Sequence, residues 1–146
     1  MRVVLDTNIL VSALMVQIGH PAAIYRLWQE GYFTLLTCAE QLDELRATLR
    51  KPAVAKRIKP YSAGRLVNKL RELAETVGPL PRVERSPDPG DDSLLALSEV
   101  GEADYLVTGD KTGLLVLGRH QGVRIVSARD FAALFAQSSQ LPARTS

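Results

Sequence analysis

The sequence has little of the chemistry on which many small proteins rely for stability or catalysis. It contains one cysteine, Cys38, and two histidines, His20 and His120, which lie a hundred residues apart. One cysteine cannot form an intramolecular disulfide, and these residues exclude a Cys/His zinc cage. The apolar run before Asp6 has only three residues, far too short for a signal-peptide core or a membrane span. We therefore expect a cytoplasmic protein without a membrane segment.

The remaining composition is that of an ordinary globular domain. Hydrophobic residues make up 46% of the chain and charged residues 23%, which argues against disorder and against a fibrous protein. A length of 146 residues suits one domain with a single sizeable core. We expect that domain to span residues 1–136, followed by a polar, mobile tail over 137–146.

Short apolar strands alternate with amphipathic helices along the chain. Leucines recur at helical spacing over 39–50 and 62–76, which predicts two helices. Four prolines mark 78–90 as a connecting loop, which could contain a short strand near Val83. This alternation predicts an α/β domain whose central, mainly parallel sheet of about five strands is flanked by helices. The clearest strands are expected at 2–5, 33–36, 105–108 and 123–126.

Acidic residues follow the strands, at the points where ligands bind in open parallel sheets. Asp6 follows the first strand and Asp110 follows the strand 105–108. Asp91 and Asp92 stand before the helix that leads into that strand, and Glu44 lies on the helix 39–50. These five acids are the candidate site residues.

Each of these acids also has an ordinary structural explanation. Asp6, Asp91 or Asp92 could cap a helix N-terminus, and Asp110 could occupy a Gly-Asp turn. Glu44 lies off the leucine stripe of its helix, where a solvated glutamate would also lie. No single acid therefore identifies a site, and only their convergence would.

Convergence of these acids would require a cation. Two carboxylates about 4 Å apart repel by roughly 4 kcal/mol at an effective dielectric constant near 20. Oxygen ligands without cysteine or histidine favour Mg²⁺ or Mn²⁺ over Zn²⁺. Such ions activate water and neutralise charge on a phosphate, which is the chemistry of metal-assisted phosphodiester cleavage.

Basic residues gather in one segment of the chain. Arginines and lysines recur over 46–71, whereas acids gather over 84–110. The chain has a net charge of +2, and setting aside the five candidate acids would leave the remainder at +7, five units higher. A basic exterior around an acidic, metal-loaded cleft suits a nucleic acid.

Four segments together resemble the PIN domains, a family of metal-dependent nucleases of Rossmann-like, three-layer fold that includes VapC-like toxins and RNA-processing enzymes. The resemblance covers roughly residues 1–135. In detail it is closest to bacterial toxin components of toxin–antitoxin pairs. Its motifs are Val-Val-Leu-Asp-Thr-Asn at 3–8, Glu44, Asp-Pro-Gly-Asp-Asp at 88–92 and Val-Thr-Gly-Asp at 107–110.

The resemblance implies roles for individual residues. Asp6, Asp91 and Asp110 would be metal ligands, with Glu44 as the fourth catalytic acid. The residues that contact and orient these ligands would be Thr7, Asn8 and Thr108. Helix phase favours Asp91 over Asp92 as the ligand, although Asp92 stays an alternative. One departure is Cys38, which stands beside Thr37 where many relatives have a serine; a small polar side chain is retained, so we expect little effect.

These observations predict a Mg²⁺- or Mn²⁺-dependent endoribonuclease that acts as the toxin of a toxin–antitoxin pair. Its expected partners are RNA, a cognate antitoxin and a second copy in a homodimer. Two alternatives remain: an RNA-binding or scaffold module without catalysis, and a housekeeping RNA-processing nuclease. A dehalogenase-type phosphohydrolase fits poorly because Asn8 occupies the position of its second acid, and a response-regulator receiver fits poorly because the acid pair lies in the wrong place.

Overall fold

The structure is a computed structural model that describes residues 1–80, 89–109 and 113–138, without the side chains of 89–91 and 137–138. The last helix reaches Ser138, so the segment expected to be a tail begins inside that helix. Residues 139–146 and the possible strand near Val83 lie outside the described residues.

In the described residues the sheet has six strands in the order β3-β2-β1-β4-β6-β5, and every pairing is parallel except that of β5 with β6. The mainly parallel α/β fold is therefore confirmed. The strands missing from the expected set are β3 and β5, which have two residues each and are too short to carry an apolar pattern. The strands are β1 (Arg2–Leu5), β2 (Thr34–Thr37), β3 (Glu75–Thr76), β4 (Tyr105–Val107), β5 (Arg119–His120) and β6 (Val123–Val126).

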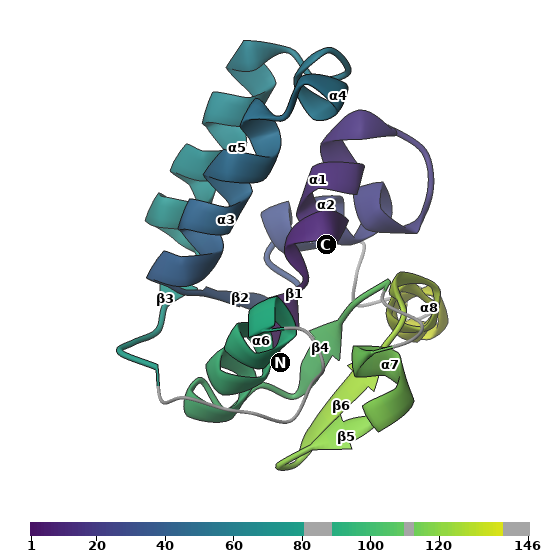
Figure 1. Ribbon diagram of the computed structural model, residues 1–146. Coiled ribbons are helices and arrows are strands. Elements are labelled where there is room, and N and C mark those ends of the chain that lie inside the picture. Colours follow the sequence, from purple (N-terminus) through teal and green to yellow (C-terminus); the bar gives the residue numbers. More distant parts are fainter. Residues whose placement is uncertain (81–88, 110–112, 139–146) are drawn as a thin grey trace.

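Helices cover both faces of this sheet, which makes three layers (Figure 1). Alternation along β1 sends Val3 and Leu5 into the core that contains the apolar faces of α1, α2, α3, α5 and α8, and Val4 into the core beneath α6 and α7. The helices are α1 (Thr7–Met15), α2 (His20–Gln29), α3 (Ala39–Arg50), α4 (Pro52–Ala55), α5 (Pro60–Leu73), α6 (Pro89–Val100), α7 (Leu114–Leu117) and α8 (Ala128–Ser138).

The ends of two predicted helices differ from the sequence-based expectation. The helix expected over 62–76 ends at Leu73, because the chain then adopts β3 and extends the sheet beside β2. Helix α6 begins at Pro89, so Asp91 and Asp92 belong to its first turn and do not precede it. Proline suits such a first turn because its missing N–H has no partner there.

Within the described residues, no single helix is long and apolar enough to cross a membrane. Only the pair α1 and α2 reaches that length and composition together, and the two helices are bent by 100° relative to each other. Both bury part of their surface in the core, through residues such as Leu10 and Ile24.

Candidate functional site

Asp6 occupies the junction between β1 and α1 and is almost fully buried, with 8% of its surface exposed. Its backbone N–H donates to the carbonyl of Val107 at 2.8 Å, which joins it to the end of β4. One carboxylate oxygen, Oδ1, accepts from the backbone N–H of Asn8 at 3.1 Å, and the other, Oδ2, accepts from Thr108 Oγ1 at 2.7 Å. Two parallel strands thus hold this carboxylate at the carboxyl edge of the sheet.

The helix-cap explanation for Asp6 is correct in geometry, but it does not account for the whole arrangement. An N-cap aspartate needs only the bond to the following turn. Here a second, buried bond comes from Thr108, which is 102 positions away along the chain and fully buried. The two bonds orient both oxygens of the carboxylate.

The described donors to the Asp6 carboxylate are both neutral. Among the described residues no lysine, arginine or histidine pairs with it. Next to it, the Oγ1 atom of Thr7 is buried and has no hydrogen-bond partner among the described residues. A buried carboxylate without a counter-charge is costly, and each of its oxygens can accept a further bond. The oxygens of this carboxylate therefore fit a hard divalent cation, for which carboxylate oxygens are the preferred ligands.

A buried polar network connects this edge to α3. Thr37 Oγ1 donates to Gln41 Oε1 at 2.7 Å, and Gln41 Nε2 donates to the carbonyl oxygen of Leu5 at 2.7 Å. The Gln41 side chain thus bridges the ends of β1 and β2, and the residue it contacts on β1 directly precedes Asp6. Because both bonds are buried, the network sets where α3 begins relative to Asp6.

Glu44 is exposed on α3, three residues after Gln41. Residues three apart are neighbours on one helix face, so Glu44 follows Gln41 by about one turn along α3. Cys38 is buried at the N-cap of α3 and makes no side-chain capping bond. Burial raises the pKa of its thiol, and the charges of Glu40 and Glu44 add to this effect.

The structure describes the other predicted site residues only in part. Asp91 lies in the first turn of α6, but its side chain is outside the described set, and so is all of Asp110, two residues beyond Thr108. Asp92 is half-buried, and the Asn8 side chain is exposed while its backbone binds Asp6. Among the described side chains, no three of His, Cys, Asp or Glu converge as a metal cluster.

Sequence reasoning missed Gln41 and Thr37. The spacing along α3 indicated Gln41, because this residue lies four positions before the fully buried Leu45 and so shares the inward face of the helix. A polar residue at such a position must find buried partners. Of the three leucines expected to define that face, Leu45 is fully buried, whereas Leu42 and Leu49 are only partly buried.

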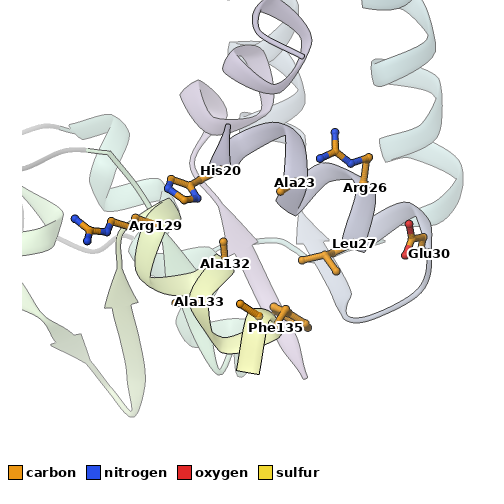
Figure 2. Close-up of a pocket in the computed structure, with 10 residues that line it drawn as sticks. His20, Ala23, Arg26, Leu27, Glu30, Arg129, Ala132, Ala133 and Phe135 are labelled. Carbon is orange, nitrogen blue, oxygen red and sulfur yellow. The ribbon is translucent and has the colours of Figure 1, made fainter. Parts of the chain in front are cut away.

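A groove of about 580 Å³ lies elsewhere, between α2 and α8, and Figure 2 shows residues that line it. Apolar side chains such as Leu27 and Phe135 share its lining with Arg26 and Arg129. None of the predicted site residues that the structure describes lines it.

Comparison with known proteins identifies the fold. A family model described as PIN domain matches residues 2–112, which is most of the chain. The chain belongs to the PIN-domain family. The match spans β1 and the Asp6 that follows it, the helix of Glu44, α6 and β4, and it confirms the resemblance expected from the sequence.

The fold of this PIN domain is similar to that of a chain in the crystal structure of VapBC2 from Rickettsia felis bound to a DNA fragment from their promoter. The two are 15% identical, with a TM-score of 0.57, and the alignment covers 87% of this chain and 98% of that chain. At this identity the likeness shows the shared fold. No curated protein matches the sequence.

Proposed function

We propose that this PIN domain is a metal-dependent endoribonuclease whose reaction occurs at the carboxyl edge of β1 and β4. The observation that carries the proposal is the buried Asp6 carboxylate, which is oriented by two bonds from neutral donors and lacks a basic partner among the described residues. PIN domains are generally nucleases, which supports the same conclusion.

Asp6, Asp91 and Asp110 would hold a Mg²⁺ or Mn²⁺ ion, with Asp92 as an alternative to Asp91. When bound, such an ion lowers the pKa of a coordinated water and offsets the charge that develops on a phosphodiester. Asp91 is carried by the first turn of α6, where the helix dipole favours anions.

The other residues of the site would orient groups and position the substrate. Thr108 and the Asn8 backbone hold the Asp6 carboxylate in one orientation. Glu44, held near the edge through Gln41, would accept a proton or bind a second ion as the fourth acid. Thr7, whose hydroxyl has no partner in the described part of the chain, would orient the metal ligands through a hydrogen bond.

The biological role we propose is that of the toxin in a toxin–antitoxin pair, with a cognate antitoxin as partner and a cytoplasmic site of action. The fold likeness to a chain of a VapBC2 complex supports this role. A housekeeping RNA-processing nuclease and a scaffold without catalysis are the alternatives. The proposed homodimer gains no support from the apolar stripes of α2 and α5, because Trp28, Leu66 and Leu70 face the core.

RNA cleavage with purified protein tests the catalytic proposal. We expect the wild-type protein to cut RNA in Mg²⁺ or Mn²⁺ and not in EDTA, and the Asp6→Asn variant to be inactive in all three. The proposal would be abandoned if no RNA is cut under any metal condition, or if the variant keeps full activity.

The toxin role needs a separate test. Expression of the wild-type protein in a bacterial host should arrest growth, Asp6→Asn should not, and co-expression of the product of a neighbouring small gene should relieve the arrest. Metal-dependent RNA cleavage without any growth arrest would favour the housekeeping nuclease.

A further inference from the structure

The segment from 46 to 71 has an unusual charge composition. Its 26 positions include nine basic residues and no acid, and all nine are exposed or partly exposed. This composition gives one part of the molecule a strong positive potential. The nine are Arg46, Arg50, Lys51, Lys56, Arg57, Lys59, Arg65, Lys69 and Arg71.

This segment forms a helical arm, which we define as α3 from Arg46, α4 and α5 to Arg71. Helices α3 and α5 lie side by side, and α4 joins them at the end away from the sheet (Figure 1). The base of α3 is tied to the catalytic edge, because Gln41 donates to the carbonyl oxygen of the residue before Asp6. At 1.5 Å per residue, the 12 residues of α3 carry the arm about 18 Å from that edge.

The charges of the arm are largely uncompensated by protein. Arg46 pairs with Asp43 at 3.5 Å, and both side chains are exposed, so solvent and salt weaken that pair. For the other eight basic residues, no ion pair joins them to any residue that the structure describes. A phosphate polymer would supply the missing counter-charge.

The arm also presents an aromatic ring of the kind that stacks on a base. Tyr61, at the start of α5, is 69% exposed. The guanidinium carbon of Arg65 lies 5.5 Å from the centre of its ring, and Arg65 Nη1 donates to its hydroxyl at 3.2 Å. Arg65 and Lys69 also line a cavity of about 250 Å³ together with Tyr25. Cations interleaved with aromatic rings are typical of single-stranded nucleic-acid binding.

We propose that the arm is the docking surface for the RNA substrate, with Tyr61 and Arg65 as a base-stacking platform and the remaining cations along the phosphates. The inference rests on the proposed function and specifies that the substrate is engaged as a single strand, away from the reacting bond. An acidic protein segment would also match the charge of the arm, but it has no bases that could stack on the exposed ring of Tyr61 beside Arg65.

The test measures binding separately from cleavage. Fluorescence anisotropy in EDTA would follow a labelled single-stranded RNA bound to the full chain over a range of salt concentrations. Lys56→Gln/Arg57→Gln removes two charges from the arm. The matched control, Arg119→Gln/Arg124→Gln, removes two exposed charges from β5 and β6 at the opposite edge of the sheet. Melting curves would verify that every variant is folded.

The two parts of the surface have different expected signatures. The arm variant should bind more weakly, and its slope of log affinity against log salt should fall by about 0.7 for each lost phosphate contact. Tyr61→Ala should weaken binding by about five-fold or more at an unchanged slope, because it removes stacking but no charge. The control variant should match the wild type in affinity and slope.

Equal affinity and slope in the arm and control variants would overturn the inference, even if the protein cleaves RNA. The inference would also be overturned if the wild-type chain did not bind RNA but bound polyglutamate. That outcome would assign the arm to an acidic protein. Arm-dependent RNA binding without any metal-dependent cleavage would uphold the docking surface and refute the nuclease.

Discussion

The amino edge of the sheet, where the parallel strands begin, and the carboxyl edge, where they end, differ in how their charged side chains are paired. At the amino edge, Arg2 binds both carboxylate oxygens of Glu75, its Nε donates to the carbonyl oxygen of Gly101 at 2.7 Å, and its backbone N–H donates to Asp104 Oδ2 at 2.8 Å. The hydrogen bonds to Glu75 raise the pKa of Arg2 and lower that of Glu75. At the carboxyl edge, Asp6 is more deeply buried, and the donors to it that the structure describes are neutral.

This difference separates structural charge from functional charge. The fold accounts for both acids of the amino edge, because the side chain of Arg2 neutralises Glu75 and the backbone N–H of Arg2 binds Asp104, which lies near the same guanidinium group. The acid of the carboxyl edge is held in place by the fold without being neutralised by any described side chain. A fold that keeps such a group pays in stability for an ability to bind a cation.

The largest effect should come from breaking the carboxyl edge. Asp6→Asn removes the charge but keeps an oxygen that can cap α1, because asparagine caps helices as well as aspartate does. RNA cleavage in Mg²⁺ should fall on the order of 100-fold or more, since the metal contribution is worth several kcal/mol. Initial rates with a labelled RNA measure this loss.

The same substitution at the amino edge provides the control. Asp104→Asn makes an identical chemical change next to Arg2, so it should leave the cleavage rate near that of the wild type and slightly lower the melting temperature. Comparable loss of activity in both variants would mean that the two edges do not differ in function.

A smaller effect is expected from the network that links the edge to α3. Gln41→Leu leaves the carbonyl oxygen of Leu5 and the hydroxyl of Thr37 without partners, which should reduce the free energy of unfolding by about 1–3 kcal/mol. We also expect kcat to fall more than KM changes, because the bond from Gln41 to Leu5 sets the position of α3, which carries Glu44, relative to Asp6. Denaturant unfolding and steady-state kinetics measure the two quantities.

Two further variants separate the effects of the two hydrogen bonds in this network. Thr37→Val removes only the bond that Thr37 donates, whereas Gln41→Glu can still accept that bond but loses the donor to Leu5. The activity should therefore follow the bond to Leu5, with Gln41→Glu more impaired than Thr37→Val. The opposite order would show that Gln41 acts only through stability.

The smallest effect should come from the exposed pair at the amino edge. The pKa of Glu75 is lowered in the folded chain, so the pair stabilises the fold above the usual glutamate pKa of about 4.3, and this stabilisation is lost as the pH falls through the lower, folded value. Glu75→Gln should thus melt slightly below the wild type near pH 7, with the difference vanishing in acid. Exposed ion pairs contribute little, so a large difference at neutral pH, or any change in cleavage, would contradict this interpretation.

Much of this architecture could be predicted from the sequence. The helix expected over 39–50 coincides with α3, and the strand expected over 123–126 coincides with β6, because both carry clear apolar periodicity. β3 and β5 could not be predicted, since two-residue strands depend on the neighbouring strand and have almost no pattern of their own.

The candidate site was predictable in residue type but not in its connections. Parallel topology places Asp6 at the carboxyl edge, which the order of strands and helices already indicated. The bond from Thr108 to Asp6 and the bridge through Gln41 depend on contacts between residues 102 and 36 positions apart. Such contacts follow from packing, and one sequence does not reveal them.

The central claim is that Asp6 is held for a divalent cation, and melting temperatures with and without Mg²⁺ test it most directly. In EDTA, Asp6→Asn should melt at the wild-type temperature or above it, because an uncompensated buried charge is gone. Mg²⁺ should then raise the melting temperature of the wild type and leave that of the variant unchanged. A variant that melts far below the wild type in EDTA, with no gain from Mg²⁺ in either protein, would show that Asp6 is only a structural cap.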